Sequence, residues 1–223
     1  MTKQIFLDFQ ATTPLDERVM EAMLPWLRRP ANPHSVENVF GRAAAEAVTE
    51  AQMQVALSVG RQAEDVIFTP GATFACNLVL RSFALPGARI VVSAIEHPCV
   101  LETARWCESQ GAQLDIIPVN DDGFIDLDSA YELTDGAGLV SVMAVNNEVG
   151  TMQPIGELAA YCEAQGTIFH TDAAQALGRM DLAKLPENAI VTLSSHKAYG
   201  PQGIGAICAS PEIITGLKPL VIG

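Results

Sequence analysis

Short runs of β-branched and aliphatic residues alternate along this chain with longer segments of helical period. Such alternation predicts an α/β fold, a mostly parallel seven-stranded sheet flanked by helices. The predicted strands are residues 66–69, 89–93, 114–119, 139–145, 167–171, 190–194 and 204–209. The predicted helices are residues 16–27, 36–59, 73–83, 100–110 and 155–165. Because the connection into the last strand is short, that strand is predicted to run antiparallel to residues 190–194.

Charge and hydropathy argue against several classes of protein. The 223 residues include 13 basic and 26 acidic side chains, and the resulting net charge of −13 disfavours binding to nucleic acid and to anionic lipid. No uncharged apolar stretch reaches the length of about 18 residues that a membrane-spanning helix needs. The first ten residues lack the apolar core of a secretory signal. We therefore expect a cytoplasmic protein that binds neither nucleic acid nor membranes.

The cysteine pattern argues against a disulfide framework. The chain has five cysteines, an odd number, and no two of them form a CxxC motif. Several lie inside apolar segments, where a free thiol behaves as a small hydrophobic group. We predict reduced thiols, mostly in the core, and no metal site. The cysteines are Cys76, Cys99, Cys107, Cys162 and Cys208.

Polar residues follow several predicted strands, at the edge of the sheet where open α/β folds bind ligands. Asp172 follows residues 167–171 in an apolar frame, where a carboxylate needs a cationic partner. Lys197 is one of four lysines, and it alone follows an apolar strand and precedes a Gly-Pro turn. In that setting a desolvated amine can act as a nucleophile near neutral pH. The turn at residues 70–73 opens a helix that could hold a phosphate, although taken alone an ordinary capped helix start is the more common explanation of such a turn.

Taken singly, these residues have ordinary explanations. Lys197 fits a surface lysine, Asp172 a helix cap and His97 a turn residue. Together they meet the needs of pyridoxal phosphate: a lysine for a Schiff base, an aspartate for the pyridinium nitrogen, an aromatic ring to stack, and a helix start with hydroxyls for the phosphate. The combination therefore favours a site for that cofactor.

A series of motifs extends this interpretation in collinear order from about residue 5 to residue 223. They are Leu7-Asp8, Ala11-Thr12-Thr13-Pro14, Asn32-Pro33-His34-Ser35, Gly71-Ala72-Thr73, Glu96-His97-Pro98, Val145-Asn146-Asn147-Glu148-Val149-Gly150-Thr151, Gln153-Pro154-Ile155, His170-Thr171-Asp172-Ala173-Ala174-Gln175 and Ser194-Ser195-His196-Lys197-Ala198-Tyr199-Gly200-Pro201-Gln202-Gly203. With these motifs the chain resembles the cysteine desulfurase family, pyridoxal-phosphate enzymes of the class V aminotransferase group with the type I fold.

The resemblance implies a function. Members convert L-cysteine to L-alanine, transfer the sulfur to an acceptor protein, supply sulfur metabolism and iron–sulfur cluster assembly, and form homodimers. It implies that Lys197 carries pyridoxal 5'-phosphate as an internal aldimine and moves protons, and that Asp172 keeps the pyridine nitrogen protonated. His97 would stack on the ring and shuttle protons. Lys197 and His97 are thus the expected catalytic residues.

The resemblance also implies which residues surround the cofactor. Asn147 and Gln175 would bond to the ring substituents, and Ala72, Thr73, Ser194 and His196 would hold the phosphate. Asn32 and Ser35 match a stretch near the substrate entrance, and His170 is expected to pack in the core. The expected cofactor-binding set is Ala72, Thr73, His97, Asn147, Asp172, Gln175, Ser194, His196 and Lys197.

The chain departs from the family pattern in three respects. We expect an N-terminal segment of residues 1–15 and a cofactor-binding large domain of residues 16–223, without the family's smaller C-terminal domain. That domain brings the cysteine that attacks the substrate sulfur and an arginine for the substrate carboxylate, and no cysteine here matches that position. Phe74 replaces an acidic residue of the family pattern, and Asn38 replaces a histidine.

Two alternatives to a cysteine desulfurase therefore stay open. Another class V enzyme, such as a selenocysteine lyase or an aminotransferase, would share Lys197 and Asp172. A non-catalytic scaffold would keep the fold without the reaction. Turnover of cysteine by this chain would exclude the scaffold.

Overall fold

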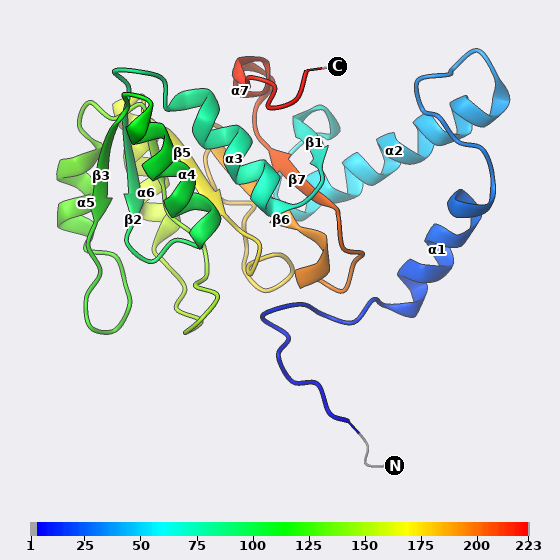
Figure 1. Ribbon diagram of the computed structural model, residues 1–223, viewed down its shortest axis with the longest axis horizontal. Helices are drawn as coiled ribbons and strands as arrows, with labels where there is room; N and C mark the ends of the chain where they lie inside the picture. The colour runs from blue at the N-terminus through cyan, green and yellow to red at the C-terminus, as the bar shows by residue number, and fades with distance from the viewer. Residues whose placement is uncertain (1–3, 223) are drawn as a thin grey trace.

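A seven-stranded sheet forms the centre of the computed structural model, which describes residues 4–222 (Figure 1). The strands are β1 (Val66–Thr69), β2 (Arg89–Ser93), β3 (Gln113–Ile117), β4 (Leu139–Ser141), β5 (Ile168–Asp172), β6 (Ala189–Ser194) and β7 (Gly205–Cys208). Their order is β1-β7-β6-β5-β4-β2-β3. β7 is antiparallel to β1 and β6, and the other neighbours are parallel. The predicted α/β sheet with an antiparallel last strand is therefore confirmed.

Helices cover both faces of this sheet, and the first helix and part of the second extend beyond it. The helices are α1 (Glu17–Arg28), α2 (Val39–Ser58), α3 (Ala72–Phe83), α4 (Pro98–Ser109), α5 (Leu127–Thr134), α6 (Ile155–Gln165) and α7 (Pro211–Gly216), with one-turn 3-10 helices η1 (Ala63–Asp65) and η2 (Ser195–Lys197). The sequence predicts neither α5 nor α7, because both are too short to show a helical period. Within residues 4–222, none of the helices combines the length and the apolar character that crossing a bilayer requires.

Two predicted strands extend beyond the observed ones. The strand predicted at residues 114–119 ends at Ile117, because Pro118 has no N–H to donate to a neighbour. The strand predicted at 139–145 ends at Ser141. The chain beyond Ser141 still runs along β5, since Val142 and Ala144 donate backbone hydrogen bonds to it.

Two apolar layers pack on the two faces of the sheet. Alternate residues of one strand enter different layers: Val91 of β2 faces the layer of α2, α5 and α6, whereas Ile90 and Val92 face the layer of α3 and α4. Because both faces are covered, the central strands are apolar at successive positions. Each fully buried aliphatic side chain contributes about 1.5–3 kcal/mol to the stability of this arrangement.

The first two helices begin at side-chain caps. The carboxylate of Asp16 accepts the N–H of Arg18 at 2.8 Å before α1. The side-chain oxygen of Asn38 accepts the N–H groups of Phe40 and Gly41, each at 3.0 Å, before α2. Asparagine is among the best residues for this role. Asn38, where the family resemblance predicts a histidine, therefore serves as a helix cap.

α1 and the first half of α2 extend away from the sheet (Figure 1). No residue of α1 is buried, and only Gly41, Ala44 and Ala56 of α2 are. Large apolar side chains are exposed on this arm, among them Met20, Leu27, Val39 and Phe40. Exposed apolar side chains gathered on one segment are typical of a binding face.

Candidate active site

A cavity of about 550 Å³ lies at the edge of the sheet where the parallel strands β2, β4, β5 and β6 end. β1 ends at the same edge, because β1 and β6 are both antiparallel to β7. The cavity brings together all the residues predicted to bind the cofactor. They are Ala72, Thr73, His97, Asn147, Asp172, Gln175, Ser194, His196 and Lys197.

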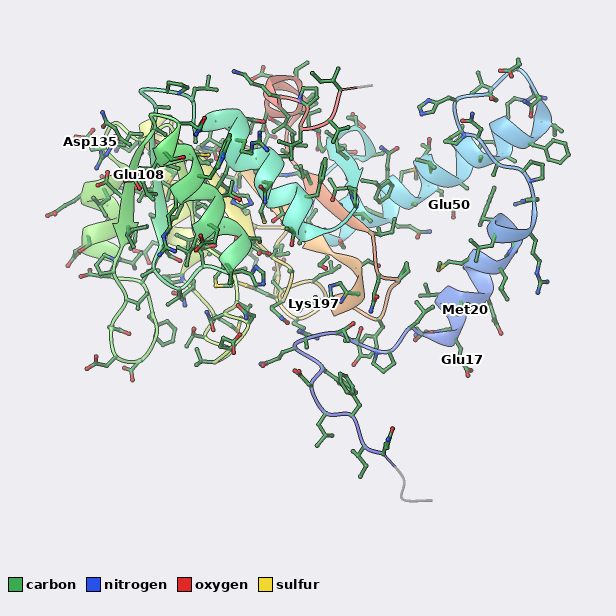
Figure 2. All side chains as sticks on the ribbon, in the orientation of Figure 1. Glu17, Met20, Glu50, Glu108, Asp135 and Lys197 are labelled. Atoms are coloured by element: carbon green, nitrogen blue, oxygen red, sulfur yellow. The ribbon has the colours of Figure 1, made fainter. Side chains whose placement is uncertain are left out.

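Lys197 ends the one-turn helix η2 that follows β6, and its amine points toward the N-terminal segment (Figure 2). Its Nζ donates to the backbone oxygens of Gln10 at 2.6 Å and Ala11 at 2.9 Å. Burial lowers the pKa of the Lys197 amine, against the opposing charge of Asp172. A lowered pKa makes the neutral, nucleophilic amine more accessible near pH 7.

Asp172 is the last residue of β5, and only 5% of its surface is exposed. Its Oδ1 accepts the N–H of Ala174 at 2.9 Å. Burial raises the pKa of this carboxyl to about 6. Asp172 takes part in none of the ion pairs found within residues 4–222. A cationic group placed in the cavity would supply the partner that this carboxylate lacks.

His97 caps the N-terminus of α4. Its Nδ1 accepts the N–H of Cys99 at 3.1 Å, so in the neutral ring the proton is on Nε2. Pro98 occupies the first turn of the helix, where its missing N–H costs nothing. The cap holds the imidazole in one orientation at the cavity wall.

The start of α3 forms another wall of the cavity. Gly71 precedes the helix with a φ of +142°, a conformation that glycine adopts readily, and no side chain caps the helix. β7 approaches closely here: a Cβ on Gly205 would lie 2.6 Å from the carbonyl carbon of Gly71. The free N–H groups of the first turn, with the hydroxyls of Thr73 and Ser194, suit an anionic group.

Sequence reasoning assigned no site role to the N-terminal segment, although it borders the cavity. In addition to the bonds from Lys197, the Gln10 oxygen accepts Gln175 Nε2 at 2.9 Å, and the Thr12 hydroxyl contacts His196 Nδ1 at 3.0 Å. Thr13 bonds to the backbone of His196. Every residue type has the same main-chain carbonyl, so the sequence gives no sign of which carbonyl will bind a side chain. These contacts could be found only from the tertiary structure.

Four other residues named in the sequence analysis lie outside the cavity or have a packing role. Asn32 and Ser35 are in the loop before α2 and do not line the cavity. Phe74 lines it and also packs against the layer of α3 and α4. His170 is fully buried, where it contacts the Ser141 hydroxyl at 2.8 Å, in keeping with the expected packing role.

The cysteines follow the prediction with one exception. Four are buried: Cys76, Cys107, Cys162 and Cys208. Cys99 is only partly buried and lines the cavity, because the first turn of α4 turns it toward β5. The sequence predicts no site role for it.

Glu96, the residue before His97, is expected to make the stability of the folded chain depend on pH. Its Oε1 accepts the Ser93 hydroxyl and the N–H of Met143, both at 2.6 Å, while Oε2 has no partner among the described residues. Burial raises the pKa of Glu96 to about 8, from 4.5 for an exposed glutamate. Between these pH values the folded chain keeps a proton that the unfolded chain has lost, so the free energy of unfolding falls as pH rises, by at most about 1.4 kcal/mol per unit.

Glu96→Gln is neutral at every pH and is expected to remove this contribution. In urea titrations the variant should gain stability relative to the wild type steadily from pH 5 to pH 8. Glu108→Gln, at an exposed position of α4, is the matched control and should show no such trend. A constant difference between Glu96→Gln and the wild type would contradict the protonated Glu96.

Comparisons with known proteins agree with this geometry. The family model for class-V aminotransferases matches residues 5–223. The chain belongs to this family. The cysteine desulfurase IscS of Rickettsia akari (strain Hartford) is 40% identical over 230 residues, which cover 100% of this chain and 56% of that protein. The resemblance to the cysteine desulfurases is therefore confirmed, and the chain spans about half the length of the curated relatives it matches.

Solved structures give the same result for the fold. A NifS-like protein superposes with a TM-score of 0.91 at 32% identity, covering 99% of this chain and 62% of the other. SspA, solved in complex with cysteine, superposes with a TM-score of 0.89 at 32% identity, covering 98% of this chain and 65% of SspA. The cofactor-binding fold of this family is thus present over the described residues.

Proposed function

We propose that this chain is the pyridoxal-phosphate-binding part of a cysteine desulfurase that converts L-cysteine to L-alanine and passes the sulfur to an acceptor protein. One observation carries the proposal: an amine with a lowered pKa, a buried carboxylate that forms no ion pair with the described residues, and a helix start without a side-chain cap from them share one cavity. The names of the relatives support the reaction, and the cysteine complex of SspA supports the substrate.

The residues of the cavity fit pyridoxal phosphate. The Asp172 carboxylate has room for a protonated ring nitrogen, which would supply the cation it lacks. The first turn of α3 offers N–H donors for a phosphate, together with Thr73, Ser194 and His196. When bound, the cofactor supplies an electron sink for the bond to the substrate α-carbon.

These residues of the cavity would then have separate roles in the reaction. The Lys197 amine would hold the cofactor aldehyde and would move a proton at the substrate α-carbon. Asp172 would hold the proton on the ring nitrogen. His97, oriented by its cap bond to the N–H of Cys99, would lie against the ring and offer Nε2 for proton transfer. Asn147 and Gln175 bind polar ring substituents.

We further propose that residues 16–223 form the large domain and residues 1–15 an N-terminal segment, in which the backbone oxygens of Gln10 and Ala11 accept hydrogen bonds from Lys197 at the cofactor site. A homodimer is supported by the apolar arm of α1 and α2 and by a groove along α1 lined by Met23, Trp26 and Tyr199. The cytoplasmic location expected from the sequence stays a prediction.

Hydrogen exchange at the substrate α-carbon tests the proposal, because it requires the cofactor and Lys197 but no attack on sulfur. The chain with added pyridoxal phosphate is incubated with L-alanine in deuterated water, and loss of the α-hydrogen signal is followed by NMR. We expect exchange in the wild type and none without cofactor. Absence of exchange in folded, cofactor-loaded protein would favour the non-catalytic scaffold.

Product analysis separates the enzyme alternatives. With L-cysteine and a thiol reductant, a cysteine desulfurase forms alanine and sulfide in equal amounts. Release of selenide from L-selenocysteine without sulfide from L-cysteine would favour a selenocysteine lyase. Conversion of an added keto acid to an amino acid would favour an aminotransferase.

A further inference from the structure

Two cysteines and an aspartate meet in the wall of the cavity. Cys76 lies on α3 and Cys99 on the first turn of α4. Their sulfur atoms and a carboxylate oxygen of Asp172 all lie within 4.8 Å of one another. The helices α3 and α4 pack side by side on one face of the sheet, which brings together two thiols that are 23 positions apart in the sequence. Neither thiol has a role in the proposed reaction.

Cys99 can be reached by small solutes, whereas Cys76 cannot be reached directly. Cys99 lines the 550 Å³ cavity and also a second cavity of about 360 Å³ on the outer side of α3 and α4, beside Arg81 and Glu102. Cys76 is fully buried, with its Sγ 3.4 Å from the Thr192 hydroxyl. A reagent that enters either cavity therefore reacts with Cys99 first, because the sulfur of Cys76 is not accessible from solvent.

The surroundings of Cys99 favour its thiolate form. The neighbouring Cys76 thiol, together with His97, holds the pKa of Cys99 well below its usual value, at about 5. The same contact raises the pKa of Cys76. The first turn of α4 adds the favourable end of the helix dipole. Asp172 of β5 is the facing acidic group, and its charge further raises the pKa of Cys76. Of the two thiols, Cys99 is therefore the one that ionises first.

We propose that Cys76 and Cys99 form a redox-active pair that peroxides oxidise to an intramolecular disulfide. The Cys99 thiolate attacks a peroxide oxygen and the O–O bond breaks, which gives a sulfenic acid and a hydroxide that takes up a proton. Cys76 then loses its proton, its sulfur attacks Cys99, the S–S bond forms and water leaves. In sum, two thiols and one hydrogen peroxide give one disulfide and two waters, with two electrons passing from sulfur to oxygen.

This oxidation acts directly on the cofactor site. The disulfide joins α3 to α4, and the N-terminal ends of these helices carry two residues of the cavity wall, Thr73 in the first turn of α3 and His97 as the N-cap of α4. It also removes the negative charge of Cys99, which contributes to the raised pKa of Asp172. The pair thus makes the electrostatics of the cavity depend on the oxidation state of the chain.

Thiol counting after peroxide treatment tests the pair and needs no bound cofactor, so its result is independent of the proposed function. The purified chain is treated with hydrogen peroxide, denatured, and titrated for thiols. We expect the loss of two of the five thiols, full recovery with dithiothreitol, and a peptide map that links Cys76 to Cys99 within one chain. Retention of all five thiols, or a link between other cysteines, would overturn the proposal.

Variants assign the order of events. Cys99→Ser should lose no thiol at the same dose, and Cys76→Ser should lose one, as a sulfenic acid trapped by dimedone. Cys107→Ser, a buried cysteine of α4 outside the pair, is the matched control and should still lose two. If Cys99→Ser still loses two thiols, the proposed disulfide between Cys76 and Cys99 is wrong.

A second measurement uses the unmodified chain and covers the case in which a variant does not fold. The rate of alkylation at Cys99 is read by mass spectrometry from pH 6 to pH 8. A thiol that is already ionised should change by less than about 2-fold, whereas a thiol with an ordinary pKa gains on the order of 50-fold over this range. The steep profile at Cys99 would contradict the reactive thiolate on which the oxidation depends.

Discussion

Replacing Lys197 with alanine is expected to abolish covalent attachment of pyridoxal phosphate to the chain. The amine of Lys197 lies in the cavity with Asp172 and the start of α3, and burial lowers its pKa. After loading with cofactor and reduction with borohydride, mass spectrometry should find one cofactor on the wild type at Lys197. In the variant, the cofactor retained should fall on the order of 100-fold or more, because among the described residues Lys197 supplies the amine that lines this cavity.

A surface lysine provides the control for this experiment. Lys184 is exposed, and its amine pairs with Asp181 at 3.3 Å. Lys184→Ala should retain the cofactor as the wild type does. If Lys197→Ala keeps the attached cofactor, or if the wild type carries it on Lys184, the assignment of Lys197 is wrong.

Phe169→Ala is expected to destabilise the chain by about 3–5 kcal/mol. Phe169 has an exposed surface of 0% and is among the largest side chains that the core buries completely. It lies in β5 between Val140 of β4 and Ala189 of β6. Truncation loses the transfer free energy of the ring and leaves a cavity that the paired strands cannot close. Domains of this kind have a total stability of about 5–15 kcal/mol, so the loss is a large part of it.

Urea unfolding followed by circular dichroism measures this effect. The midpoint should fall while the slope of the transition stays unchanged. Phe124→Ala is the matched control, since that ring is 40% exposed, and its effect should stay below about 1 kcal/mol. Equal losses for the two variants would contradict a core that depends on Phe169.

The strands and longer helices could be predicted because their signals are local. β-branched runs such as residues 190–194 and helical periods such as residues 155–165 reflect burial of a strand on two faces and of a helix on one. α5 and α7 escaped prediction because eight and six residues are too few to establish a period. The end of β4 at Ser141 depends on pairing with neighbours, which no local pattern records.

Much of the cavity followed from the same local reasoning. Lys197 and Asp172 each follow a predicted strand, and the ends of parallel strands meet at one edge of the sheet. Residue type and position along the chain were therefore enough to bring these side chains together.

Other features of the cavity were decided by tertiary structure alone. The carbonyls of Gln10 and Ala11 accept hydrogen bonds from Lys197, which lies 187 and 186 positions away, and a main-chain oxygen is the same in every residue type. Cys76 and Cys99 face each other only because α3 packs on α4. Sequence patterns record which residues are buried or polar, whereas the partner of each group depends on how distant segments pack.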